Sequence, residues 1–156
     1  MFLIRRSLGF ILLLILIGCN SSPEKPEAQA FSIDTRIAVS AEVNQDINNR
    51  PSPIVVRIFE LKNLGIYTES DFYDLFENFE SVLGGDLLAS EQFHLNPGDT
   101  QTLKNSIATE TKYIAVIAAF RNINRAMWRD AIIIPVEKDT KILIYVDKLS
   151  VSVWKK

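Results

Sequence analysis

Cysteine and histidine are almost absent from this chain of 156 residues, which has one of each, Cys19 and His94. A single cysteine excludes a disulfide within the chain, and a single histidine excludes a His-rich metal site. The motifs CxxC, HExxH and GxSxG are also missing. His94 alternates with Phe93 and Leu95, which favours an ordinary strand residue over a metal ligand. We therefore expect no enzyme, no metal and no cofactor.

The chain also has little excess of charge, with a formal net charge of -2 and basic residues that are scattered along the sequence. Such a chain lacks the positive patch that nucleic-acid binding needs. Acidic residues do gather in one segment, but a glycosidase needs two acids that face each other across a cleft. These five acids share the polar side of one predicted helix, so we interpret them as a solvated face: Glu69, Asp71, Asp74, Glu77 and Glu80.

The longest hydrophobic run ends just before Cys19. It spans residues 8–17, follows Arg5 and Arg6, and is interrupted by one glycine. Crossing about 30 Å of hydrocarbon takes roughly 20 apolar residues, so the run is short for a membrane span. A basic start, an apolar middle and a small residue at the end are typical of a secretory signal peptide. We expect residues 1–18 to be such a peptide.

The residues that precede Cys19, Leu16-Ile17-Gly18, resemble the lipobox of bacterial lipoproteins. The resemblance implies a covalent lipid on the Cys19 sulfur, cleavage before Cys19 and acylation of the freed amine. Several acyl chains anchor a protein stably, whereas one holds it only marginally. Two alternatives for Cys19 are a buried structural thiol and a catalytic cysteine far from His94. Asn20, in place of an aspartate, favours the outer membrane.

Residues 19–30 comprise the predicted lipidated cysteine and a flexible tether rich in Ser, Pro, Glu and Ala. The eleven residues from Asn20 to Ala30 reach roughly 35 Å when extended. Cleavage before Cys19 removes two arginines and no acid, which lowers Lys+Arg from 17 to 15 against 19 acids and gives a net charge of -4. We expect the folded domain to span residues 31–156.

Alternating apolar residues predict strands through most of this domain. Residues 31–43 have an apolar residue at almost every second position, and residues 54–61 are β-branched and aromatic. Between them, NQDINNRPSP at 44–53 is typical of a loop. Further strands are predicted at 89–95, 100–107, 112–120, 128–136 and 140–154. The first two of these are expected to form a hairpin around the turn at 96–99, and 112–120 is apolar on both faces, like a central strand.

One segment, residues 68–85, has the spacing of a helix instead. Its apolar residues are three or four positions apart, which predicts one amphipathic helix that packs on a sheet rather than in a partner's groove: Phe72, Leu75, Phe76, Phe79 and Leu83. Thr68 and Asp71 resemble a capping box, Ser70 is an alternative cap, and Gly84-Gly85 ends the helix. Seven or eight short strands with one helix predict a two-sheet β-sandwich.

Several short motifs follow one another in a distinctive order. They are RPSP at 50–53, a strand that ends in Leu61-Lys62, DFYDLF at 71–76, Leu83-Gly84 with Asp86, Pro97-Gly98, AAFR at 118–121 and Trp128-Arg129. Their order behind a lipobox resembles the type VI secretion lipoprotein family known as TssJ, VasD or SciN. The resemblance covers nearly the whole chain.

This resemblance implies a transthyretin-like sandwich of two sheets with an added helix, anchored in the outer membrane and facing the periplasm. It also implies a partner, the periplasmic C-terminal region of the inner-membrane protein TssM. In the family, the loop between the first two strands contacts that partner, and here the loop maps to residues 44–53. The implied partner-binding residues are Asn44, Gln45, Asp46, Ile47, Asn48, Asn49 and Arg50, with Ile47 as an exposed apolar anchor.

Asn49 stands where the family often has glycine, and asparagine tolerates the left-handed backbone conformation that glycine adopts. RPSP also has a simpler interpretation, a rigid turn that starts the next strand. We therefore expect an outer-membrane lipoprotein that acts as a structural adaptor and recruits TssM through this loop. An alternative from another class is a transthyretin-like periplasmic lipoprotein that binds a small ligand or a glycan.

Overall fold

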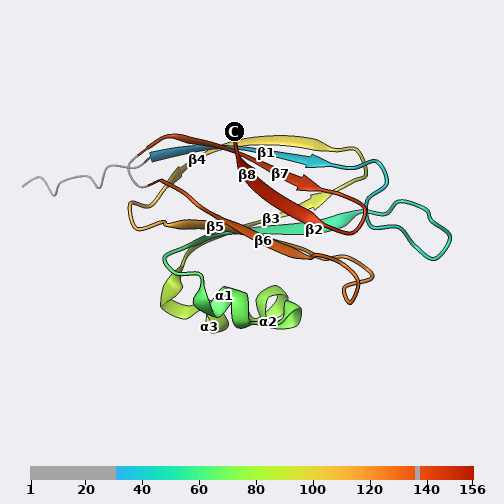
Figure 1. The fold of residues 1–156 in the computed structure, drawn as a ribbon, viewed down its shortest axis with the longest axis horizontal. Coiled ribbons are helices and arrows are strands. Elements are labelled where there is room, and N and C mark those ends of the chain that lie inside the picture. The colour runs from blue at the N-terminus through green and yellow to red at the C-terminus, as the bar shows by residue number, and fades with distance from the viewer. Residues whose placement is uncertain (1–30, 136–137) are drawn as a thin grey trace, which may run out of the picture.

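Eight strands form two four-stranded sheets that pack face to face (Figure 1). The computed structural model describes residues 31–135 and 138–156. The strand order is β4-β1-β7-β8 in one sheet and β3-β2-β5-β6 in the other, which confirms the predicted sandwich. The strands are β1 Phe31–Val39, β2 Ile54–Leu61, β3 Leu87–Leu95, β4 Thr100–Ile107, β5 Tyr113–Ala118, β6 Arg129–Ile133, β7 Thr140–Val146 and β8 Val151–Lys155.

The predicted signal peptide, Cys19 and the tether fall in residues 1–30, outside the described residues. Their lipid attachment therefore stays a prediction. Among the residues that are described, no helix is long and apolar enough to cross a membrane.

The hydrophobic core has two layers, one between the sheets and one between the β3-β2-β5-β6 sheet and the helices. β5 contributes to both, because Ile114, Val116 and Ala118 belong to the first layer while Ala115 and Ile117 belong to the second. All five side chains are buried. This confirms the prediction that residues 112–120 contain a strand covered on both faces.

The first strand is shorter than its sequence pattern predicts, because β1 ends at Val39 rather than at residue 43. The chain turns after Ser40, whose carbonyl accepts a hydrogen bond from the Val43 amide at 3.2 Å. Val43 is still completely buried, so its side chain reaches the core from a turn. The apolar pattern extends from β1 to Val43 because Val43 is buried too, even though strand pairing ends at Val39.

The predicted hairpin around residues 96–99 does not form. β3 pairs with β2, whereas β4 pairs with β1 in the other sheet, so the turn links the two sheets. Locally it has ordinary turn chemistry, with Gly98 at φ 83° and the Asn96 amide donating to an Asp99 carboxylate oxygen at 2.7 Å. The same turn can connect two strands of a hairpin or two strands in different sheets. The turn residues therefore do not determine which strands β3 and β4 pair with.

The predicted single helix is divided into α1 Gly65–Glu69, α2 Phe72–Glu77 and α3 Phe79–Leu83, followed by a 3-10 turn at Gly84–Asp86. Ser70 and Asp71 have extended backbones, and the Asp71 carboxylate caps α2 by accepting from the Asp74 amide at 2.9 Å. The Thr68 hydroxyl instead donates to the Gly65 carbonyl, so the expected capping box is absent. Gly84 ends α3 with φ 49°, as predicted.

Two arginines of the underlying sheet hold these short helices. Arg57 of β2 donates to the carbonyls of Leu75 (3.4 Å) and Phe76 (2.7 Å), near the end of α2. Arg129 of β6 donates to the carbonyls of Tyr67 and Ser70, at the end of α1, at 2.9 and 2.7 Å. The C-terminus of a helix carries partial negative charge and unpaired carbonyls, which a cation stabilises. No basic residue lies in the last turn of any of the three helices.

Aromatic rings complete the two arginine sites. The Arg57 guanidinium lies 4.3 Å from the ring centroid of Phe79, and that of Arg129 lies 4.8 Å from the ring of Trp128. Phe72 in turn packs edge-on against Trp128 with ring centroids 5.4 Å apart. Trp128 and Arg129, part of a motif that resembles the secretion lipoproteins, are therefore structural residues that join the helical layer to the sheet.

Candidate functional site

The loop between β1 and β2 spans residues 40–53 and projects beyond the end of the sandwich (Figure 1). β1 begins at the opposite end, so any segment that precedes Phe31 enters the fold far from this loop. The structure thus separates the predicted anchor side of the domain from the predicted partner side by the length of the sheets.

Asn44 holds the base of the loop. Its side chain is buried, donates to the Pro53 carbonyl at 2.7 Å and accepts from the Arg121 amide at 2.8 Å. Its own amide donates to the Lys148 carbonyl, and its backbone is left-handed with φ 50°. Asn44 therefore joins the loop to two neighbouring connections and does not present its side chain to a partner. We treat it as a positioning residue.

Gln45 also belongs to the base rather than to the tip. It is half-buried, and among the described residues its side-chain oxygen Oε1 is buried without a hydrogen-bond donor. A buried acceptor without a donor costs about 1–3 kcal/mol. Among the described residues, the base of the loop therefore contains one hydrogen-bond acceptor, Gln45 Oε1, that has no donor.

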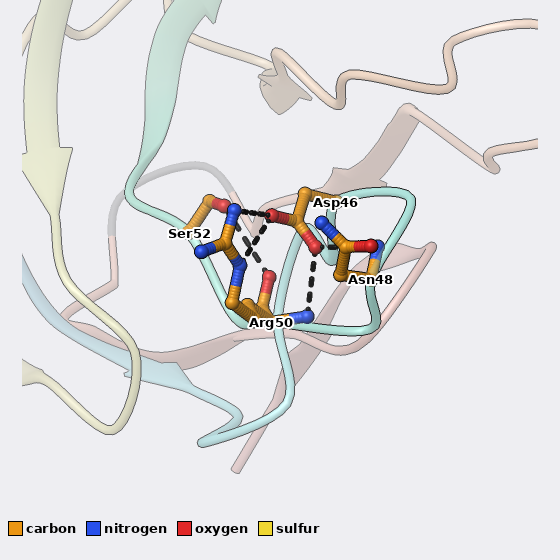
Figure 2. Close-up of polar contacts among 4 residues, drawn as sticks. All are labelled: Asp46, Asn48, Arg50 and Ser52. Carbon is orange, nitrogen blue, oxygen red and sulfur yellow. Dashed lines mark hydrogen bonds and ion pairs between the residues drawn. The ribbon is translucent and has the colours of Figure 1, made fainter.

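The tip of the loop is organised by one carboxylate (Figure 2). The Asp46 side chain accepts from the amides of Asn48 and Arg50 at 2.8 and 2.9 Å. It also accepts from Arg50 Nε and pairs with the same guanidinium, both at 2.8 Å. The backbone closes the same ring, since the Asp46 amide donates to the Arg50 carbonyl and the Asn49 amide to the Asp46 carbonyl.

Hydrogen bonds from Arg50, first from its amide and then from its side chain, lower the pKa of Asp46 below its usual value. Because these bonds favour the ionised form, the carboxylate is charged at neutral pH and the ring is intact there. Asn49 has φ 60°, which confirms that asparagine takes the left-handed conformation at this position. The loop is therefore a closed, preorganised turn.

Ile47 lies at the apex of this turn and is 98% exposed. Asn48, Asn49 and Arg50 are exposed beside it. A large apolar residue on a rigid turn, surrounded by polar groups, has the composition of a small protein-binding surface: an apolar anchor with a polar rim. Sequence reasoning identified these residues but missed the role of Asp46 as the organiser, although an Asp four residues before an Arg was a visible signal.

One cavity lies elsewhere, between the sheets on the side where β3 and β4 are edge strands, and it measures ≈ 160 Å³. Apolar side chains line most of it, together with Glu60, which accepts from the Thr111 hydroxyl at 3.0 Å and whose pKa is raised by burial. Ligand pockets usually measure about 300–1,000 Å³. The cavity is thus smaller than the site that the ligand-binding alternative requires.

Within the described part of the chain, no group of three His, Cys, Asp or Glu residues could hold a metal ion. His94 is an exposed residue of β3, as its alternation predicted, and its ring lies 3.2 Å from the Gln92 amide nitrogen.

Comparisons with known proteins bear on the whole fold. Among curated proteins, none matches the sequence. TssJ1 of Pseudomonas aeruginosa, a type VI secretion lipoprotein, is 23% identical with a TM-score of 0.79 over 82% of this chain and 98% of its own. Serratia marcescens Lip, a membrane-bound component of the type VI secretion system, is 27% identical with a TM-score of 0.75 over 82% and 99%. A chain in a structure described as the TssM C-terminal domain from EAEC is 24% identical with a TM-score of 0.67 over 79% and 97%.

A family model covers the sequence itself. The model described as "Type VI secretion lipoprotein, VasD, EvfM, TssJ" matches residues 32–149, which include β2 to β7 and all of β1 except Phe31. The chain belongs to this family of type VI secretion lipoproteins.

Proposed function

We propose that the protein is a lipid-anchored adaptor of a type VI secretion membrane complex. Acyl chains on Cys19 fix it to the outer membrane, and the tip of the β1–β2 loop binds the periplasmic C-terminal region of a TssM-type protein. The family supports this role, as does the similar chain in a structure described as the TssM C-terminal domain. The observation that carries the proposal is the preorganised tip with its exposed Ile47, at the end of the domain opposite to the start of β1.

The physical chemistry of the tip fits a protein partner. Asp46 and Arg50 satisfy each other, so the tip presents almost no uncompensated charge. Because the backbone is already ordered, binding costs little conformational entropy. A partner pocket that buries Ile47 gains roughly 1.5–3 kcal/mol from its side chain, provided that the polar groups of Asn48 and Asn49 find partners. The partner surface should therefore contain an apolar pocket with hydrogen-bonding groups around it.

The direct test truncates the anchor and measures binding to a purified TssM periplasmic domain by calorimetry. Ile47→Ala should weaken binding about tenfold or more, as expected for an anchor residue at a protein interface. Ile133→Ala is the matched control, because Ile133 is 60% exposed on β6, away from the loop. Equal affinities for both variants and the native chain would exclude Ile47 as the anchor.

A second test concerns the lipid. Cys19→Ser should abolish palmitate labelling in cells and release the domain from membranes into the periplasm. Labelling that persists in this variant would rule out Cys19 as the attachment site. The loop variant Ile47→Ala should keep its label, which separates anchoring from partner binding.

A further inference from the structure

One outer face of the sandwich has no covering layer among the residues that the structure describes. The helices lie over the β3-β2-β5-β6 sheet, whereas no described element covers the outer face of the β4-β1-β7-β8 sheet (Figure 1). Ile33, Thr35 and Ile37 of β1 are buried between the sheets, so the residues that alternate with them point outward. We call this outer surface the bare sheet face. Its principal side chains are Arg36, Lys104, Lys141, Leu143, Tyr145 and Trp154.

Strand register brings these residues together. Lys104 and Lys141 flank Asp34 in one cross-strand row, and Arg36 lies beside Leu143 in the next row of outward residues. Leu143 is opposite Trp154, and the exposed Tyr145 follows two residues along β7. The bare sheet face thus combines three cations, one acid and a cluster of apolar and aromatic side chains. Apolar side chains that gather on an exposed surface and are surrounded by polar residues often mark a protein-binding or membrane-binding site.

The helical layer on the opposite side has the complementary chemistry. Residues 63–86 contain six acids and no lysine or arginine. None of the five acids exposed on the helices forms an ion pair with any described residue. Ile66 and Tyr73 are exposed among them, at 43% and 60%. We call this surface the acidic helical face; its carboxylates belong to Glu69, Asp71, Asp74, Glu77 and Glu80.

The positions of the bare sheet face and the acidic helical face would allow one copy of the chain to contact the next in the same way along a row. They lie on opposite outer sides of the three layers, and both run along the direction that joins the start of β1 to the β1–β2 loop (Figure 1). If the bare sheet face of one copy rests on the acidic helical face of the next, every loop points the same way. All first strands then also start on the same side, as anchoring in one membrane requires.

We propose that the bare sheet face docks onto the acidic helical face of a second copy of this chain, so that anchored copies stack side by side. The contact is heterologous, because two different surfaces meet, and it can therefore continue into a row or close into a ring. Cations meet unpaired carboxylates, while Leu143, Tyr145 and Trp154 meet Ile66 and Tyr73. Confinement to one membrane raises the effective concentration of copies, so a weak contact suffices. The contact does not involve the β1–β2 loop and is independent of TssM binding.

The experiment uses the full-length lipidated chain in vesicles of zwitterionic phosphatidylcholine, with energy transfer measured between separately labelled copies. Native copies should show transfer above that of random mixing, and raising the salt concentration should reduce it because exposed charges are screened. The double variant Arg36→Glu/Lys141→Glu should weaken association about tenfold, since like charges then meet. Arg125→Glu/Lys112→Glu, which reverses an exposed arginine and an exposed lysine outside the face, is the matched control.

Restoring the charges on the other surface gives the decisive measurement. Copies with Arg36→Glu/Lys141→Glu, mixed with copies that carry Asp74→Lys/Glu77→Lys, should regain association. Circular dichroism checks that each variant folds, and the neutral pair Arg36→Gln/Lys141→Gln replaces the reversed pair if Glu beside Asp34 unfolds the sheet.

Three results would overturn the proposal: native transfer no greater than random mixing, equal loss of transfer in the Arg125/Lys112 control, or no recovery in the mixed variants. A membrane surface is the competing occupant of a basic aromatic face. Binding of the Cys19→Ser chain to phosphatidylglycerol vesicles that depends on Arg36 and Lys141, while energy transfer does not, would assign the face to lipid instead.

Discussion

The β1–β2 loop and the helical layer are both made of short irregular pieces, and in both a charged side chain binds backbone groups. In the loop tip, the charge is local, because Asp46 binds amides two and four residues further along the chain. In the helical layer it is remote, because Arg129 binds carbonyls 59 and 62 residues away. A local charge can order a turn without the rest of the fold, whereas a remote one couples two layers and so contributes to the stability of both.

Removing the remote charge should have the largest effect. Arg129→Ala leaves two carbonyls near the end of α1 without their donor and removes the packing on Trp128, so the free energy of unfolding should fall by about 3 kcal/mol. Urea unfolding followed by tryptophan fluorescence measures it. Arg125→Ala, an exposed arginine in the preceding connection, is the control and should change stability by less than about 0.5 kcal/mol. Equal effects for the two variants would mean that Arg129 does not hold the helical layer.

The base of the loop should respond next, because the Asn44 side chain accepts a hydrogen bond from a remote amide, that of Arg121. Asn44→Gly keeps the left-handed backbone but removes the bonds to the Pro53 carbonyl and the Arg121 amide. We expect a loss of about 2 kcal/mol by the same unfolding assay. Asn49→Gly, at the other left-handed asparagine, should be nearly neutral because its side chain is exposed. A neutral Asn44→Gly would contradict the role of Asn44 as the base.

Removing the local charge should change dynamics more than stability. In Asp46→Ala, the amides of Asn48 and Arg50 lose their acceptor, so their hydrogen exchange should become faster while amides of β2 stay protected. Global unfolding should change little, because the tip is exposed and buries no core. If Asp46→Ala lowered the free energy of unfolding as much as Arg129→Ala, the tip would be coupled to the core. The contrast between a local and a remote charge would then be wrong.

Acid should produce the smallest and most specific effect. The pKa of Asp46 is lowered in the folded protein, so its ionised form favours the ordered tip. This contribution is complete above the ordinary aspartate pKa of about 3.9 and is lost as the pH falls through the lower folded value. Amide shifts of Asn48 and Arg50 followed by NMR should titrate below about pH 4. Shifts that titrate near pH 6 would assign the transition to another group.

The two regions also differ in how well the sequence predicted them. The loop boundary at β2, the exposure of Ile47 and the left-handed Asn49 all follow from residues next to one another, and the structure has each of them. The helical segment was predicted as one helix because its apolar spacing is continuous from Phe72 to Leu83. The break at Ser70–Asp71 has a local signal, since Asp71 caps α2. The bonds that Arg57 and Arg129 donate to the ends of α2 and α1 come from distant strands, and no local pattern reveals them.

The sequence by itself determined which segments are strands, which segment is helical, where the chain turns and which side chains are apolar enough to form the core. It did so because these properties depend on backbone preferences and burial along short stretches. The tertiary structure alone decided that β3 and β4 join different sheets, that Arg57 and Arg129 bind the ends of the short helices and that Asn44 turns inward. Each of these depends on hydrogen-bond partners far away in the chain, and only the folded chain brings those partners within reach.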